Sequence, residues 1–276
     1  MSNGPCLPAN VLKAKLLAGE PCCVFGVRLA RSVNIVTIAQ AAGYHGLYID
    51  LQHSSMSVDR AAQICHAALH SGVTAFARVP TLEAGLIGRL LDAGAQGILA
   101  PGLRSAEEAH ALVRAALLPP LGDRSPGLVI SPRLAGLAGR ALTQAANAAT
   151  LLIAMVESEE GVANAAAIAA VPGIDALQVG GHDLTTSMGI PGEYLHPRVQ
   201  SSVATAIAAC RAAGKPLIMG GIRKPEEVAL YRRMGAARCY FTGSDIGFVQ
   251  AGAQAAAARM AETDRQLFAA AETRQG

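Results

Sequence analysis

Residues 74–101 read TAFARVPTLEAGLIGRLLDAGAQGILAP and contain one complete unit of the predicted fold. Two short apolar runs, Thr74–Val79 and Gly97–Pro101, have the length and composition of strands that are buried on both faces. Between them, Leu82–Ala93 has apolar residues at helical spacing and is followed by Gly94, a residue type that commonly ends helices. The stretch therefore predicts a strand, a helix and a second, parallel strand.

The same alternation repeats along the rest of the chain. The other predicted strands are Cys23–Leu29, Gly46–Leu51, Thr150–Glu157, Ala176–Gly180, Pro216–Gly220 and Cys239–Thr242. Eight strands alternating with helices over 276 residues predict a single-domain (β/α)8 TIM barrel, for which about 250 residues are usual. A doubly wound sheet is the alternative, but the Gly-x-Gly-x-x-Gly turn that would favour it is absent from the sequence.

Three segments lie outside this regular pattern. Residues 1–20 form a short N-terminal extension, and the predicted helix from Ile246 to about Ala271 is the longest in the chain. Residues 119–149 make a connection that is too long for an ordinary barrel loop. Such long loops usually carry a function or a small element of their own.

Composition and charge limit the class of protein. The chain is 51% hydrophobic and 16% charged, which is typical of a globular domain and excludes general disorder. Its net charge of +3 and its 4% aromatic content give no support to nucleic-acid binding. Neither a membrane span nor a signal peptide is visible, so we expect a cytoplasmic protein without a membrane partner. The six cysteines match neither a zinc site nor a disulfide framework.

The candidate site residues are the polar side chains that follow the predicted strands, because TIM-barrel enzymes carry their chemistry there. Glu157 and Asp183 follow neighbouring strands. A pair of carboxylates suits Mg²⁺ or Mn²⁺, whose remaining coordination positions are filled by water and substrate oxygens. Capping of the helices that follow is the alternative role for both residues.

Three further candidates come from the second and third predicted strands. His53 follows Asp50 closely, and a histidine near a carboxylate can act as a general base, although a solvated loop position is equally compatible. Arg78 ends a buried strand and could stabilise an oxyanion. The alternative is that Arg78 only forms a structural ion pair, with Asp50 or with Asp92.

Taken in order along the chain, several segments resemble the HpcH/HpaI aldolase family. They are Tyr48–Ser54, Ala77–Pro80, Leu90–Ala95, Pro119–Arg124, Val156–Ser158 and Val179–Gly189. This family comprises class II pyruvate aldolases, of which the best-known members cleave 2,4-dihydroxyhept-2-ene-1,7-dioate or 2-dehydro-3-deoxyglucarate. The resemblance runs from about Val24 to the last predicted helix.

The resemblance implies a metal-dependent aldehyde-lyase that reversibly cleaves a 4-hydroxy-2-oxo acid to pyruvate and an aldehyde through a metal-stabilised enolate. Glu157 and Asp183 then bind a divalent ion, either Mg²⁺, Mn²⁺ or Co²⁺. His53 is the catalytic base, which Asp50 orients and polarises. Arg78 contacts the keto oxygen of the substrate and stabilises the enolate.

The resemblance also implies substrate and subunit contacts. The backbone amides around Gly181, His182 and Asp183 receive the substrate carboxylate. Asp92 approaches the site of a neighbouring subunit. The family commonly forms homohexamers, as trimers of dimers that exchange their last helix, and the predicted helix from Ile246 fits that role.

Three positions depart from the family pattern. Gln52 replaces a common Glu, Met155 replaces a common Gln, and His182 replaces a common Ala. These changes affect the open side of the metal site, so the sequence specifies neither the aldehyde nor the metal. An oxaloacetate-type decarboxylase, a CoA-ester lyase of the same barrel and a catalytically dead binding barrel are the alternative functions.

Overall fold

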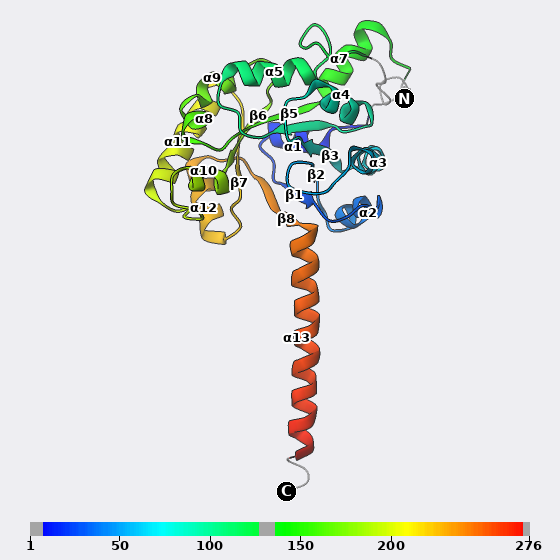
Figure 1. Ribbon diagram of the computed structural model, residues 1–276, viewed down its shortest axis with the longest axis vertical. Helices are drawn as coiled ribbons and strands as arrows, with labels where there is room; N and C mark the ends of the chain where they lie inside the picture. The colour runs from blue at the N-terminus through cyan, green and yellow to red at the C-terminus, as the bar shows by residue number, and fades with distance from the viewer. Residues whose placement is uncertain (1–7, 127–135, 273–276) are drawn as a thin grey trace.

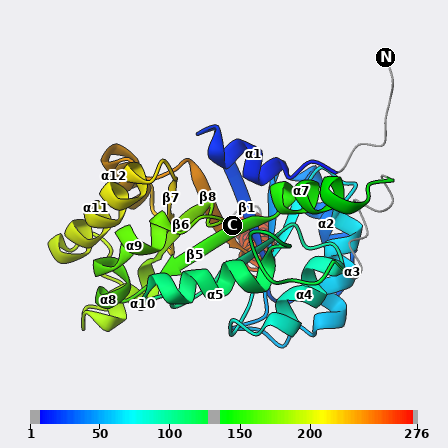
Figure 2. The same cartoon turned by 90° about the horizontal axis from the view of Figure 1, so that it is seen from above.

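The computed structural model of the protein describes residues 8–126 and 136–272, with side chains up to residue 268. Its strands are β1 (Cys22–Val27), β2 (Gly46–Asp50), β3 (Thr74–Arg78), β4 (Gly97–Ala100), β5 (Leu151–Val156), β6 (Ala176–Gly180), β7 (Leu217–Gly220) and β8 (Cys239–Ser244). They form one parallel sheet in the order β7-β6-β5-β4-β3-β2-β1-β8, with helices around the outside (Figures 1 and 2). The predicted (β/α)8 TIM barrel is confirmed, and each predicted strand is present with boundaries shifted by at most two residues.

Apart from the first and the last, the helices connect successive strands on the outer face. They are α1 (Val11–Leu17), α2 (Asn34–Ala41), α3 (Val58–Ala68), α4 (Ala84–Asp92), α5 (Ala106–Ala116), α7 (Gly139–Ala149), α8 (Glu159–Ala163), α9 (Ala165–Ala170), α10 (Gly181–Ser187), α11 (Pro197–Ala212), α12 (Pro225–Met234) and α13 (Asp245–Glu272). The helix predicted over Glu159–Ala170 is wrong as a continuous element. Asn164 ends α8 and begins α9 with φ −92° and ψ 5°, while its side-chain amide donates to the Arg104 carbonyl at 2.7 Å.

The N-terminal helix α1 closes the bottom of the barrel. Leu12 and Leu16 are buried and belong to the same apolar cluster as the inward-facing side chains of the strands. Asn10 fixes the helix start, because its amide donates at 2.8 Å to the carbonyls of Gln96 and Ala149 in two bottom loops. The barrel is therefore open only at the carboxyl ends of its strands, where an active site is expected.

The long connection predicted over residues 119–149 contains helix α7, while residues 127–135 lie outside the described part. Asn147 joins α7 to the end of the α5 segment through two hydrogen bonds with the backbone of Leu118, at 2.8 and 2.9 Å. Leu118 also packs with Leu142 and Ala146 of α7 in a small separate apolar cluster. The connection thus carries an element with its own packing.

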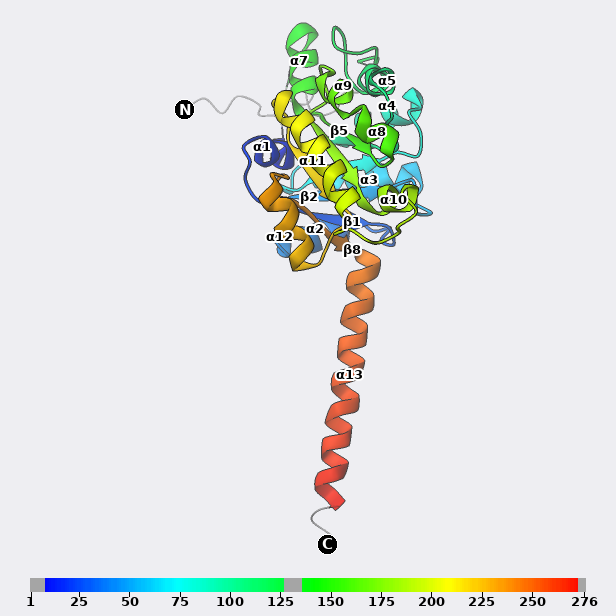
Figure 3. The same cartoon turned by 90° about the vertical axis from the view of Figure 1, so that its left-hand side faces the viewer.

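Helix α13 leaves the barrel after its first turn, where the ring of Phe248 packs against those of Phe25 and Tyr44. Its 28 residues project away from the strands, as Figures 1 and 3 show. Large apolar side chains on it are exposed, among them Val249 (61%), Met260 (64%) and Phe268 (67%). None of the described helices has the length and apolar character that are needed to cross a membrane.

The first residue of α13 fixes the loop that follows β1. Asp245 is 4% exposed, and its carboxylate accepts hydrogen bonds from the backbone amides of Arg28, Leu29 and Ala30 at 3.0, 2.9 and 2.7 Å. From the other side, the Arg31 guanidinium donates to the carbonyls of the same three residues at 2.8 to 3.2 Å. The loop is held by one anion and one cation, so its conformation is closely defined.

Replacing Asp245 should therefore destabilise the barrel. In the Asp245→Ala variant, three backbone amides lose a charged acceptor, and we expect the free energy of unfolding to fall by about 2–4 kcal/mol. Urea unfolding at fixed protein concentration measures this change. Glu160→Ala, which removes an exposed acidic residue from α8, is the control and should change stability by less than about 0.5 kcal/mol. Equal effects of the two substitutions would show that other contacts hold the loop.

Candidate active site

A cavity of about 640 Å³ opens at the carboxyl ends of the strands. The predicted site residues that line it are His53, Arg78, Glu157, Gly181, His182 and Asp183. Arg28, Tyr48, Gln178 and Arg223 also line this mouth cavity and were not assigned a role from the sequence. The structure thus brings candidates from β2, β3, β5 and β6 to one place.

Asp50 lies beneath the cavity and joins several of these residues. Its side chain is fully buried, and its Oδ1 accepts hydrogen bonds from the backbone amides of Gln52 and His53 and from Arg78 Nε, each at 3.0 Å. Its Oδ2 accepts from Arg78 Nη2 at 2.6 Å and from Arg28 Nε at 2.7 Å. One carboxylate therefore positions two guanidinium groups and the start of the loop that carries His53.

The protonation of Asp50 follows from these contacts. Burial raises the pKa of this carboxyl, but the hydrogen bonds from Arg78 and the His53 amide, with the charges of Arg78 and Arg28, outweigh burial and lower the pKa below its ordinary value. Asp50 is thus an anion that binds His53 through the backbone amide of that residue. The predicted polarisation of the His53 imidazole by Asp50 stays a prediction.

The structural alternative for Arg78, an ion pair with Asp50, is present, and the contact of Arg78 with the substrate stays a prediction. Arg78 forms a bidentate ion pair with Asp50 and lies over the Tyr48 ring, with 5.4 Å from its guanidinium carbon to the ring centroid. It also lines the mouth cavity. A guanidinium that is fixed before the ligand arrives can stabilise a developing negative charge without reorganisation.

Asp50 provides a pH-dependent test of this network. Its folded-state pKa is lowered, so its contribution to stability is present above the ordinary pKa near 3.8 and is lost as the pH falls through the folded-state value. We expect Asp50→Asn to cost about 3–5 kcal/mol at pH 7, because it leaves the buried Arg78 and the partly exposed Arg28 without their carboxylate partner. The difference from the wild type should shrink below pH 4 in urea unfolding. The exposed Asp59→Asn is the control, and a difference for Asp50→Asn that stays constant down to pH 3 would contradict the assignment.

Glu157 and Asp183 approach each other from neighbouring strands. Burial, the charge of Asp183 and a hydrogen bond with Asp183 together raise the pKa of Glu157 to about 7, against the opposing effects of Arg78 and the Gly102 amide. Ser158 caps α8, since its hydroxyl accepts from the Gly161 amide at 3.1 Å, so Glu157 is not needed as a helix cap. Two carboxylates in contact are unfavourable unless a proton or a cation lies between them.

Two glycines make room for this arrangement. A Cβ atom on Gly180 would lie 2.6 Å from Oε2 of Glu157, and one on Gly181 would lie 2.8 Å from the Gly220 carbonyl. Side chains at either position would displace Glu157 or the backbone that leads to Asp183. Steric limits therefore explain why both positions 180 and 181 are glycine.

The two carboxylates fit a divalent cation that prefers oxygen ligands. Within residues 8–126 and 136–268, no group of three or more His, Cys, Asp or Glu side chains is arranged to hold a metal. Glu157 and Asp183 would thus leave several coordination positions for water and substrate, as Mg²⁺ sites commonly do. This donor set differs from the closed sets that hold structural zinc.

Gln178 is a functional candidate that the sequence analysis missed. It lies on β6 in register with Met155 of β5, is 2% exposed and lines the mouth cavity. Its buried Oε1 accepts no hydrogen bond from the described chain. Where the family commonly has an amide two residues before the metal-binding Glu, this chain has Met155, and Gln178 brings an amide to the same level of the barrel. The signal was one polar residue within an apolar strand.

Asp92 does not reach the mouth cavity of its own chain. It pairs with Arg124 at 2.9 Å, in a separate groove of about 560 Å³ between α4 and the α5 segment. Burial raises the pKa of Asp92, which the charge of Arg124 partly offsets. Its contribution to the site of a neighbouring subunit stays a prediction.

The barrel and its mouth define a class of TIM-barrel lyase, and comparison with known proteins identifies the family. The model of the HpcH/HpaI aldolase/citrate lyase family matches residues 29–270, and the chain belongs to this family. It is 38% identical over 225 residues to the 4-hydroxy-4-methyl-2-oxoglutarate aldolase of Chaetomium globosum, which covers 79% of this chain and 82% of that relative. The predicted aldolase, a carbon–carbon lyase, is thereby confirmed.

Other relatives agree with this placement. The hydroxypyruvate/pyruvate aldolase of Paraburkholderia phytofirmans is 38% identical over 211 residues, which is 74% of this chain and 80% of that relative. The crystal structure of an HpcH/HpaI aldolase from Desulfitobacterium hafniense DCB-2 superimposes with a TM-score of 0.84 at 27% identity, and covers 90% of this chain and 96% of the other. The shared architecture thus includes nearly the whole chain.

Proposed function

We propose that the protein cleaves a 4-hydroxy-2-oxo acid to pyruvate and a second carbonyl compound, with a divalent metal ion as cofactor. The observation that carries this proposal is that the carboxylates of Glu157 and Asp183 and the guanidinium of Arg78 line the same cavity at the mouth of the barrel. No lysine is among the residues that line the mouth cavity in the described chain. A Schiff-base mechanism, which requires a lysine amine, is therefore not supported.

Glu157 and Asp183 would hold Mg²⁺, Mn²⁺ or Co²⁺, since oxygen ligands accept each of these ions. When bound, such an ion supplies Lewis acidity and a template for the C1 carboxylate and the C2 oxygen of the substrate. The backbone amides of Gly181, His182 and Asp183 lie beside the carboxylate pair, at the start of α10. We assign them to the C1 carboxylate of the substrate.

His53 and Arg78 then perform the bond cleavage. His53 removes the proton of the C4 hydroxyl, the oxygen electrons form the new carbonyl, and the C3–C4 bond breaks. The electrons of that bond form the enolate of pyruvate, whose oxygen Arg78 stabilises with an N–H group. Protonation of the enolate at C3 completes the release of pyruvate. Asp50 acts through the position of Arg78 and of the His53 loop.

The names of the relatives suggest the first substrate to test. The Chaetomium globosum relative is named for 4-hydroxy-4-methyl-2-oxoglutarate, and an aldol cleavage of that compound gives two molecules of pyruvate. The Paraburkholderia phytofirmans relative is named for hydroxypyruvate and pyruvate. We propose that this chain also forms pyruvate from substrates of this class.

Metal removal and an Arg78 variant test the mechanism. Excess chelator should abolish pyruvate release from 4-hydroxy-4-methyl-2-oxoglutarate, and added Mn²⁺ or Mg²⁺ should restore it. Arg78→Ala should slow the exchange of the methyl protons of pyruvate with deuterated water by about 10²–10³-fold, because the enolate loses a fixed donor. Arg60→Ala, which removes an exposed arginine of α3 outside the mouth cavity, serves as the control in NMR measurements of exchange. Full activity in excess chelator would exclude the metal-dependent mechanism.

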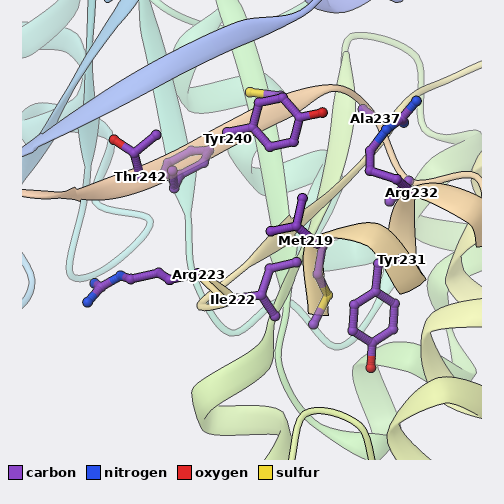
Figure 4. A pocket seen from close by; sticks show the side chains of 12 residues that line it. Met219, Ile222, Arg223, Tyr231, Arg232, Ala237, Tyr240 and Thr242 are labelled. Carbon is purple, nitrogen blue, oxygen red and sulfur yellow. The ribbon is translucent and has the colours of Figure 1, made fainter. Parts of the chain in front are cut away.

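We also propose that α13 packs against a second copy of the chain. Each strand from β1 to β7 is followed by a helix that returns to the barrel, whereas the helix after β8 projects outward (Figure 1). In the described sheet, β7 and β8 are the two end strands and are not paired with each other. A cavity of about 230 Å³ lies beside them. Its lining includes Met219, Ile222 and Tyr231 together with Tyr240 and Thr242 of β8 (Figure 4).

The dimensions and composition of α13 suit this role. At 1.5 Å per residue its 28 residues span about 42 Å, enough to reach a neighbouring barrel. Its exposed apolar side chains would be covered by the apolar surface of a partner, as expected for an interface. Exchange of this helix would pair the chains, and the Asp92 groove would face a neighbouring site in a trimer of such dimers.

The assembly is tested by mass measurement in solution. We expect light scattering of the full chain to give about six times its 28.2 kDa mass, and the double substitution Val249→Asp, Met260→Asp to lower it, because both side chains are exposed and apolar on α13. Asp264→Asn, on the same helix, should keep the wild-type mass. A wild-type monomer would contradict helix exchange.

A further inference from the structure

The mouth cavity contains more fixed positive charge than is needed for the part of the substrate that becomes pyruvate. Arg28 and Arg78 both bind Asp50, so a single carboxylate balances only one of the two guanidinium groups. Glu157 and Asp183 would be balanced by the divalent ion of the proposed function. The positive charge of one of these two guanidinium groups therefore remains for an anionic group of the ligand, in addition to that of Arg223, which also lines the cavity.

Arg28 is the cation that remains available to the ligand. Its side chain is 36% exposed and lines the cavity, and its Nε donates to Asp50 at 2.7 Å. Arginine has five N–H donors in one plane, and the contacts with Asp50 and Tyr48 engage only part of them. Asp245 and Arg31 hold the backbone of residues 28–30 through hydrogen bonds, and this fixes the backbone position from which the Arg28 side chain extends.

The order of the strands places Arg28 at the far end of the substrate. Glu157 and Asp183 follow β5 and β6, whereas Arg28 and His53 follow β1 and β2 on the opposite side of the barrel. A substrate whose C1 end lies at the carboxylate pair and whose C4 hydroxyl reaches His53 crosses the mouth. The substituent on C4 then points toward β1, where Arg28 lies.

We propose that Arg28 binds a carboxylate on C4 of the substrate, so that the second product of cleavage is itself a 2-oxo acid. This inference rests on the proposed aldol cleavage and specifies its substrate class. A planar guanidinium matches a carboxylate in bidentate geometry. A substrate with an apolar group at that position would cover the donors of Arg28 that Asp50 does not engage without bonding to them, which penalises binding.

A matched pair of substrates tests the role of Arg28. 4-Hydroxy-2-oxoglutarate and 4-hydroxy-2-oxovalerate differ only in a carboxylate or a methyl group on C4. We expect the wild type to have a kcat/KM at least about 10²-fold higher for the dicarboxylate, and Arg28→Gln to reduce this ratio to less than about fivefold. The two substrates share the part that becomes pyruvate, so a general loss of activity in the variant cancels in the ratio of the two kcat/KM values.

Two further variants complete the test. Arg223→Gln removes the other unassigned arginine of the cavity lining and should keep the ratio within about threefold of the wild type. Arg28→Lys keeps the charge but not the planar pair of donors, and should lower the ratio by at least about tenfold. This variant tests the proposal if Arg28→Gln does not fold.

The outcomes separate this inference from the proposed function. A wild-type ratio near one, or an unchanged ratio in Arg28→Lys or in soluble Arg28→Gln, overturns the role of Arg28. Loss of the ratio in Arg223→Gln would assign the carboxylate to Arg223 and overturn it as well. Exchange of the methyl protons of pyruvate with deuterated water measures the formation of the enolate alone. Its absence in the metal-loaded wild type would instead reject the aldolase mechanism.

Discussion

The buried carboxylate of Asp50 is the constraint on which the rest of the mouth depends. It has no contact with solvent, and its two oxygens accept hydrogen bonds from Arg28, Arg78 and two backbone amides. Burial of an anion is tolerated only with such full compensation. Three adjacent strand ends are consequently fixed with respect to one another, and the cations that face the ligand cannot turn away from it to find other partners.

The opposite side of the mouth has the reverse polarity. Glu157 and Asp183 form a pair of acidic groups beside two glycines, at whose positions a side chain would clash. An acid with an oxygen-rich end and a second anionic end fits a cavity with a metal-binding pair on one side and guanidinium groups on the other. Catalysis in such a site depends mainly on preorganised charge, because the groups need little movement when the enolate forms.

Much of this arrangement could be predicted from local sequence, and the remainder could not. The strands were evident because apolar runs buried on both faces have a distinct composition, and Glu157, Arg78 and Asp183 were evident because they interrupt such runs at the end. The pairing of Arg28 with Asp50 was not, since it depends on how far each strand extends at the mouth. Helix α1 was also missed, because its two buried leucines are too few to mark a periodic pattern.

Asp245 connects two properties of the protein that are usually considered separately. It is the first residue of the projecting helix, and its carboxylate also holds the amides of the loop that carries Arg28. A change in the direction of that helix would be transmitted over a single residue to the guanidinium that selects the substrate. Divergence of subunit contacts in relatives of this chain would therefore be coupled to divergence of substrate preference, through the hydrogen bonds of Asp245.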